Sequence, residues 1–143
     1  GEELLVISVS MIIAALAHNS EVLPELAALV FGGTLSVWQM IWVLPVLVWF
    51  GSIFGVHPVI SSAPLLALFS PYLTVFDAMF IMQGHMIGWS TGTMSSIASL
   101  SVITVADQFQ LRPVQLAFGR NLASGGLAIG GGGLWALVYF MVT

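Results

Sequence analysis

Long apolar stretches fill most of this chain, and short polar or glycine- and proline-containing segments separate them. The strongest apolar stretch covers residues 34 or 36 to 54, which as a helix is long enough to cross the hydrocarbon core of a bilayer. Pro45 is expected to kink this helix. Gly55 and Pro58 then follow closely, so the helix is expected to stop at Gly55. The next apolar segment, residues 59–69, has only about half the length of a span.

A second helix and a second interruption follow. Thr74 and Asp77 match a capping box, which predicts a helix that runs from there toward Trp89. Residues 90–96 carry five hydroxyl side chains and Gly92, and this composition predicts that the helix breaks at Ser90. The two interruptions share one design, in which an apolar span ends at a polar break and a short apolar helix follows.

The remaining segments complete the expected organisation. Residues 97–105 are short and apolar, and a last span, beginning at residue 114 or 122, reaches residue 142. Its many glycines, at 125–126 and 130–133, favour close helix packing or a local break. At the other end, residues 4–17 form an apolar helix of marginal length, and residues 21–31 form a helix too short to span a bilayer. We therefore expect a single transmembrane domain over 1–143, with peripheral helices in 1–33 and both breaks in 34–143.

Composition places this pattern in a membrane. Apolar residues make up 59% of the chain, and the 6% that are charged include no lysine. Eight charges are too few to cover the surface of a soluble domain of 143 residues. The fold class predicted is therefore all-α, a polytopic membrane protein with about four to five spans and two broken-helix or re-entrant elements.

Charge and terminal residues add three expectations. The net charge of −4 makes nucleic acid an implausible partner. Arg112 and Arg120 lie in or beside loop 108–121, which the positive-inside rule places in the cytoplasm, with the C-terminus on the opposite side of the cell (inner) membrane. Because the chain begins with Gly1 and lacks a basic signal region, we expect it to be part of something longer.

The two breaks are the candidate solute site. Free backbone persists at membrane depth only where it lines a cavity or a solute site, and paired broken helices indicate the binding site of a secondary transporter. A helix that begins at such a break attracts anions, and freed carbonyls can coordinate Na⁺. The candidate ligands of substrate and ion are His57, Ser61, Ser62, Ser90, Thr91, Gly92, Thr93 and Ser95. Two alternatives remain open: Ser61 and Ser62 hydrogen-bond within a proline-kinked helix, and residues 90–96 form a polar interfacial loop.

Three titratable residues are candidates for proton coupling. His57 and His85 are candidates because histidine is the side chain whose ordinary pKa lies near neutral pH, and Asp77 is the ionisable group expected within the membrane. The alternatives are a histidine bonded to backbone at a helix end, and an aspartate that only caps its helix. The histidine spacing fits no metal-ligand pattern, so no metal is expected. No catalytic motif is present, so an enzyme is not predicted, and no cofactor is expected beyond Na⁺ or H⁺ as coupling ion.

The order of these features resembles the C-terminal repeat of the ion transporter superfamily, which includes divalent-anion/sodium symporters, citrate carriers, arsenite permeases and sodium/proton antiporters. The resemblance rests on the break at 55–64 with its half helix, and on residues 88–96 followed by Leu111, Arg112 and Pro113. It covers residues 35–143 and implies transport of a small, anionic solute driven by a Na⁺ or H⁺ gradient. It also implies that a second copy, or a complementary membrane chain or repeat, completes the site. The alternative function is a non-transporting membrane subunit for packing and assembly, whose glycine-rich last helix contacts partners.

Overall fold

The computed structural model describes residues 2–21, 25, 28–29, 32, 35–69, 74–97 and 99–143. These residues form helices and connections, and no strand occurs among them, which confirms the all-α prediction. The helices are α1 (Glu2–His18), α3 (Val37–Ile53), α4 (Pro58–Phe69), α5 (Val75–Ser95), α6 (Leu100–Gln108), α7 (Pro113–Ala117) and α8 (Arg120–Val142).

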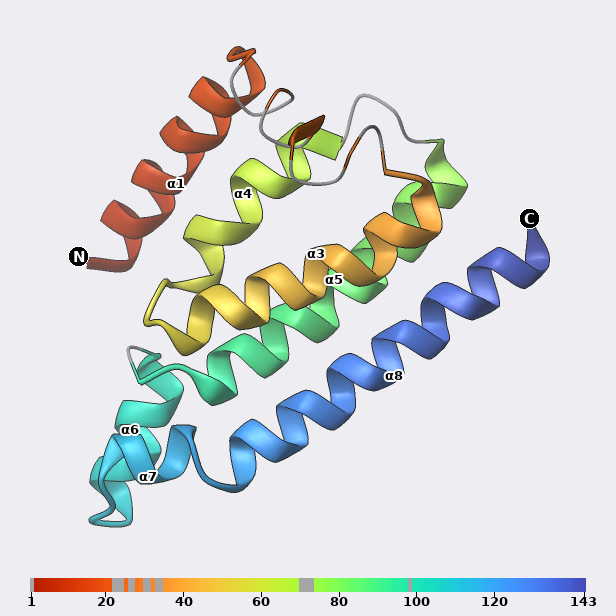
Figure 1. Ribbon diagram of the computed structural model, residues 1–143. Coiled ribbons are helices and arrows are strands. Elements are labelled where there is room, and N and C mark those ends of the chain that lie inside the picture. The colour runs from red at the N-terminus through yellow and green to blue at the C-terminus, as the bar shows by residue number, and fades with distance from the viewer. Residues whose placement is uncertain are drawn as a thin grey trace.

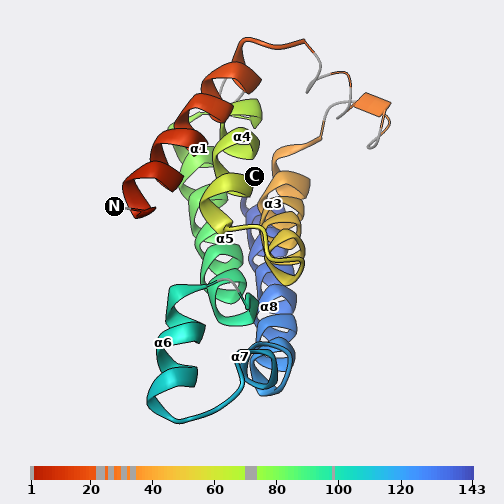
Figure 2. The same ribbon diagram turned by 90° about the vertical axis from the view of Figure 1, so that its left-hand side faces the viewer.

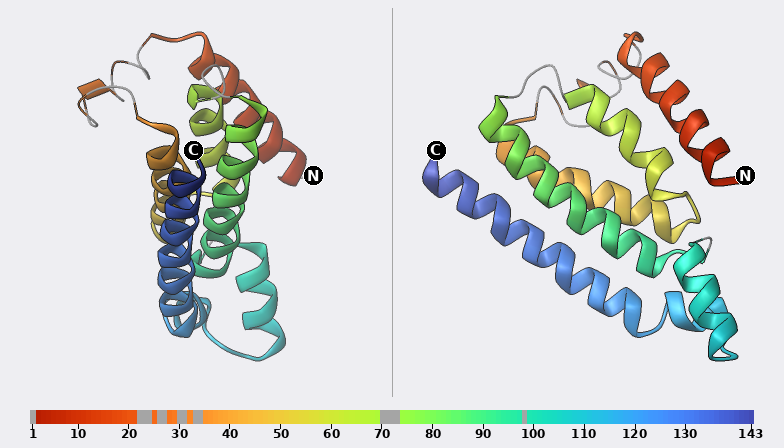
Figure 3. Two further views of the ribbon diagram at one scale, coloured as in Figure 1. Left: turned by 90° about the vertical axis from the view of Figure 1, so that its right-hand side faces the viewer. Right: turned by 180° about the vertical axis from the view of Figure 1, so that it is seen from behind.

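The helices form two groups, which Figures 1 and 3 show from opposite sides. Helices α3, α5 and α8 run side by side and all contact one another; we call them the body. Helix α4 turns back from the end of α3 and packs mainly against α1; we call α1 and α4 the arm. Helices α6 and α7 lie beyond the end of α5, close to the start of α8 (Figure 2).

Three glycines, each one turn apart, bring α5 into close contact with α3. A Cβ atom at Gly84 would lie 2.5 Å from the carbonyl oxygen of Ile41, and a Cβ atom at Gly88 would lie 2.4 Å from Cα of Pro45. Gly92 approaches the C-terminal end of α3 as well, but there it meets the side chain of Ser52 rather than backbone. Such small-residue repeats are typical of closely packed membrane helices. Ile41, Leu44, Val48 and Ile81 fill the core beside this contact.

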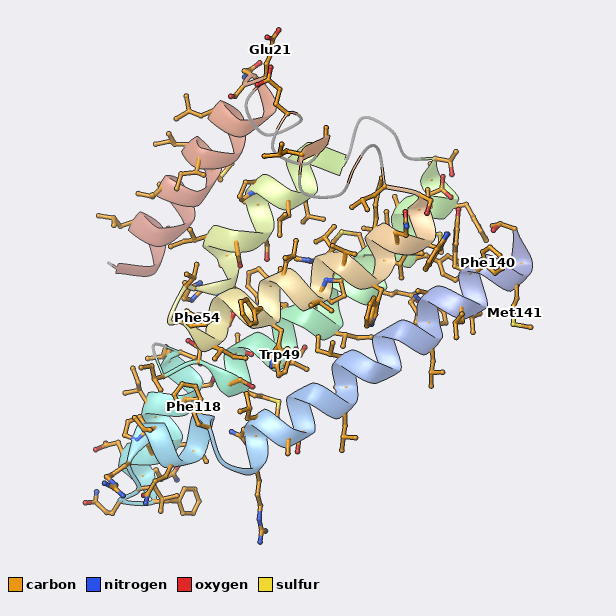
Figure 4. All side chains as sticks on the ribbon, viewed as in Figure 1. Glu21, Trp49, Phe54, Phe118, Phe140 and Met141 are labelled. Carbon is orange, nitrogen blue, oxygen red and sulfur yellow. The ribbon has the colours of Figure 1, made fainter. Side chains whose placement is uncertain are left out.

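Glycines of α8 accommodate two tryptophan rings of α3. The Cβ position of Gly125 lies 2.8 Å from Nε1 of Trp49, and that of Gly133 lies 2.9 Å from Nε1 of Trp42. Figure 4 labels Trp49 between α3 and α8. The Trp42 indole donates a hydrogen bond to the carbonyl oxygen of Ile129 (3.3 Å). Helix α8 continues through its glycine run, so of the two expectations for this segment the structure supports close packing.

The first predicted break is confirmed, and the residues that cause it are those expected. The N–H of Val56 bonds to the Gly51 carbonyl and the N–H of Gly55 to the Ser52 carbonyl, which is the Schellman pattern of helix ends. Gly55 has φ = +84°, a conformation that glycine adopts without steric cost. Helix α4 begins at Pro58, where the missing N–H costs nothing. Pro45 lies inside α3, which runs on past it to Ile53.

The second break is not where the sequence predicts it. Helix α5 continues through residues 90–95 and ends at Ser95, with Ser96 as its C-cap, six residues later than expected. The physical reason is that hydroxyl groups in this segment find partners within the helix and need no break: Thr91 donates to the Ile87 carbonyl (2.8 Å) and Thr93 to the Ser90 carbonyl (2.8 Å). Serine and threonine can bond to a carbonyl one turn back without ending a helix. Residues 90–95 therefore form neither a break nor a loop.

Fewer helices than the sequence predicts are both long and apolar enough to cross a membrane. Among the described residues, one helical stretch is long and apolar enough to cross a membrane: Pro113–Val142, with 30 residues and a mean hydropathy of 1.6. Helix α3 is apolar but has 17 residues, because Ser36 and Phe54, at the ends of the predicted stretch, are its caps. Helix α1 agrees with the predicted N-terminal helix. The short helix predicted for residues 21–31 lies mostly outside the described residues.

Candidate functional site

Three helix segments meet where the two predicted breaks were expected to converge. A Cβ atom at Gly92 of α5 would lie 2.6 Å from Oγ of Ser52, near the end of α3, and 3.4 Å from Cγ of Pro58, the first residue of α4. We call this contact the junction, defined by Ser52, Pro58 and Gly92 together with the buried hydroxyl residues on these helices. Those hydroxyl residues are Ser62, Thr91 and Ser95.

Hydroxyl protons around the junction are used within their own helices. Ser52 donates to the Val48 carbonyl (2.8 Å), and Ser62 donates to the Pro58 carbonyl (2.5 Å). Thr91 donates to carbonyls one turn back in the same manner. A hydroxyl oxygen that has donated its proton keeps lone pairs for accepting or coordinating. The junction is therefore better equipped to coordinate a cation than to donate hydrogen bonds to an anion.

Ser61 follows this pattern, whereas Ser95 accepts a hydrogen bond. Ser61, half-buried, also donates to the Pro58 carbonyl (3.1 Å). Ser95 is fully buried and accepts a hydrogen bond from the indole of Trp49 (3.3 Å). The bonds of Ser61 and Ser62 are those of the within-helix alternative. They leave acceptor oxygens rather than free donors at both positions.

The start of α4 offers no free N–H group to an anion. Pro58 has no N–H, and the N–H of Val59 donates to Nδ1 of His57 (3.2 Å). The N–H groups of Ile60 and Ser61 both bond to the His57 carbonyl. His57 thus caps the helix with both its ring and its backbone, and its Nδ1 carries no proton in this arrangement. The donors that a helix N-terminus presents to anions are occupied here.

The predicted residues do not all lie together. Gly92 reaches the start of α4, so the two predicted segments do meet, through Gly92 and Pro58. Ser90, in contrast, is exposed, and Thr93 is half-buried with its hydroxyl bonded to the carbonyl of Ser90.

His85 is buried in α5 and its Nδ1 has no hydrogen-bond partner in the structure. Its ring meets that of Trp89 edge-on, with 6.1 Å between centroids. Helices α3 and α4, which pack against α5, contain no titratable side chain. A proton on His85 would therefore lack a counter-charge from either helix.

Asp77 has the helix-capping role that was the alternative to a site role. Its Oδ2 accepts from the backbone N–H (3.1 Å) and the hydroxyl (2.6 Å) of Thr74, and Oδ1 accepts from the Tyr139 hydroxyl (2.5 Å). The Thr74 hydroxyl and then the Tyr139 hydroxyl lower the pKa of Asp77 in the first turn of α5. The bond to Tyr139 ties the start of α5 to the end of α8.

Several residues that hold α3, α5 and α8 together are not among the predicted site residues. Gly84 and Gly88 were detectable, because with Gly92 they repeat at every fourth position. Trp49 and Tyr139 carried no local signal, since their partners are 46 and 62 residues away. Among the described residues, no three His, Cys, Asp or Glu side chains are grouped so that they could hold a metal ion. No family model, curated protein or solved structure matches this chain.

Proposed function

We propose that this chain forms part of a secondary active transporter in the cell (inner) membrane, and that the junction binds the coupling cation. The observation that carries the proposal is the contact of Gly92 with Pro58 and Ser52, which places a helix break beside buried hydroxyl groups. Hydroxyl oxygens whose protons are committed to helix carbonyls can coordinate Na⁺ through their lone pairs. A buried, break-containing site without fixed charge suits an ion that must bind and leave again.

The nature of the solute rests on the resemblance to the ion transporter superfamily. That resemblance suggests a small anion, although the capped start of α4 offers an anion no N–H donors. The same resemblance suggests that a second copy or complementary membrane chain completes the site. It also fits an orientation in which the connection from α6 to α8, with Arg112 and Arg120, faces the cytoplasm.

Uptake into proteoliposomes tests the proposal. The purified chain is reconstituted, and accumulation of labelled anions is measured under a Na⁺ gradient and, separately, a H⁺ gradient. We expect gradient-driven uptake that is lost in Ser62→Ala and Thr91→Ala, because each removes a junction oxygen. Ser124→Ala is the matched control, since Ser124 is an exposed hydroxyl residue of α8 and should transport normally. Uptake that persists in both junction variants would overturn the assignment of the site.

A second function is favoured by the outer face of α8. Leu127, Leu134 and Leu137 are exposed there, and Gly130 and Gly131 have open space in front of them. Such a face suits a packing and assembly subunit that contacts another membrane chain without transporting anything. Under this function, folded protein moves no solute under either gradient, and Gly130→Leu disrupts assembly while Thr91→Ala has no effect.

A further inference from the structure

Residues 54–57 link α3 to α4, and each of the two helix ends that they join has its own capping hydrogen bonds. The last carbonyls of α3 receive the N–H groups of Gly55 and Val56. The first N–H of α4, which belongs to Val59, donates to the His57 ring. Among the described residues, no hydrogen bond crosses from the part of this link up to residue 56 to the part from 57 onward. The angle between α3 and α4 can therefore change without breaking a hydrogen bond of either helix end.

The body is tied together along its whole length. Two polar ties, Trp42 to the Ile129 carbonyl and Trp49 to Ser95, join α3 to its two neighbours. At the two ends, α5 is joined to α8 by Tyr139 to Asp77 and by Asn121 to the Met94 carbonyl (3.1 Å). The glycine contacts described above lock α5 and α8 against α3. The body should consequently move as one unit.

The arm is attached to the body by apolar contacts, among them the packing of Leu65 and Leu66 of α4 against the core of the body. Helix α4 packs more extensively against α1 than against α3 or α5. Among the side chains of α1 and α4 that the structure describes, none is hydrogen-bonded to α3, α5 or α8. The contact that remains at the link is made by Pro58 against Gly92, a residue without a side chain to obstruct rotation.

We propose that α1 and α4 form a rigid arm that swings against the body of α3, α5 and α8 about residues 55–57. Gly55 gives the pivot its left-handed turn and has nothing within 4 Å of its Cβ position. The swing would alter the contact at Pro58 and Gly92 and thereby open or close the junction. The proposal concerns the fold of the chain and stands whether or not the chain transports a solute.

Distance measurements between spin labels test the swing. Labels are attached through a ketone-bearing amino acid at exposed positions Leu5 in α1, Met86 in α5 and Leu127 in α8, in the full chain reconstituted in lipid nanodiscs. We expect the pair at 5 and 127, which joins arm and body, to give a broad or multi-peaked distance distribution. The pair at 86 and 127 lies within the body and should give a single narrow peak. Equal widths for the two pairs would overturn the proposal.

A reversible lock provides the decisive comparison, because the chain has no native cysteine. The Cβ position of Gly51 in α3 lies 3.8 Å from Cβ of Ser61 in α4, within the ~3.5–4.5 Å that a disulfide spans. Gly51→Cys with Ser61→Cys should narrow the distribution of the pair at 5 and 127 when oxidised and broaden it again on reduction. A distribution that does not change between the oxidised and reduced forms would contradict a swing about the link.

A single substitution at the pivot gives an independent outcome. Gly55→Ala disfavours the left-handed turn, so the mean distance of the pair at 5 and 127 should shift while that of the pair at 86 and 127 stays constant. Gly130→Ala is the matched control, because it adds the same methyl group in open space within α8. Identical distributions in the two alanine variants would exclude Gly55 as the pivot.

Discussion

Replacing Gly88 with alanine tests the contact on which the body depends. The new Cβ atom would lie 2.4 Å from Cα of Pro45, 2.7 Å from its carbonyl oxygen and 2.8 Å from its Cβ. Two of these are backbone atoms of α3, which cannot rotate away, so the two helices must separate. Overpacking of this kind costs about 1–3 kcal/mol or somewhat more, and alanine returns roughly 1 kcal/mol of helix propensity. With backbone in the way, we expect a net loss near the upper limit, about 2 kcal/mol.

Gly130→Ala supplies the comparison, because nothing lies within 4 Å of its Cβ position. This variant should gain up to ~1 kcal/mol, so the two variants should differ by about 3 kcal/mol. That difference corresponds to roughly a hundredfold in the unfolding equilibrium constant. Titration of the detergent-solubilised protein with sodium dodecyl sulfate, followed by circular dichroism, measures it. Unfolding of both variants at the same sodium dodecyl sulfate fraction would refute the close contact between α5 and α3.

Three further substitutions test a hydrogen bond, a helix cap and a packing contact in the body, and each is measured by the same titration. Tyr139→Phe removes the hydrogen bond to Asp77 and should lower the free energy of unfolding by about 1–2 kcal/mol. Because this bond lowers the pKa of Asp77, the loss should become smaller as the pH falls below the ordinary pKa of an aspartate. A loss of the same size at neutral and acid pH would contradict the bond. Thr74→Ala removes the cap of α5 and should cost about 1 kcal/mol, so an unchanged midpoint would argue against the capping box. Gly125→Ala places a methyl group 2.8 Å from Nε1 of Trp49 and should cost about 1 kcal/mol, less than at Gly88 because a side chain can shift; a gain in stability would contradict this packing.

Local chemistry was predictable wherever one helix turn decides the outcome. The end of α3 at Gly55 and the capping box of Thr74 and Asp77 follow from neighbouring residues, and the structure confirms both. The break predicted at Ser90 is wrong because composition does not reveal where a hydroxyl proton goes. In residues 90–95 the protons of Thr91 and Thr93 go to carbonyls of the same helix, which therefore continues.

The sequence patterns did not predict the contacts between helices that form the candidate site. The meeting of Gly92 with Pro58 was expected only in outline, since the distance between the two segments depends on the angle at Gly55. The second partner of Asp77 is a tyrosine on another helix, which no local rule identifies. Of the four to five spans that the sequence predicts, one helical stretch among the described residues, Pro113–Val142, is both long and apolar enough to cross a membrane. The roles of the junction hydroxyls and the resemblance to the ion transporter superfamily stay predictions.

The contact between Gly84 and Ile41 links the residue at position 84 to the residue at position 45. Pro45 has no N–H, so the carbonyl of Ile41, four residues earlier, loses its donor within α3. The Cβ position of Gly84 lies 2.5 Å from that oxygen, so a Cα hydrogen of Gly84 is directed at it and can form a weak C–H···O bond. The neighbouring helix thus compensates in part for the donor that proline removes. Gly84 and Pro45 should therefore be energetically coupled, while the Ile41 oxygen excludes a side chain at position 84 whether or not residue 45 is proline.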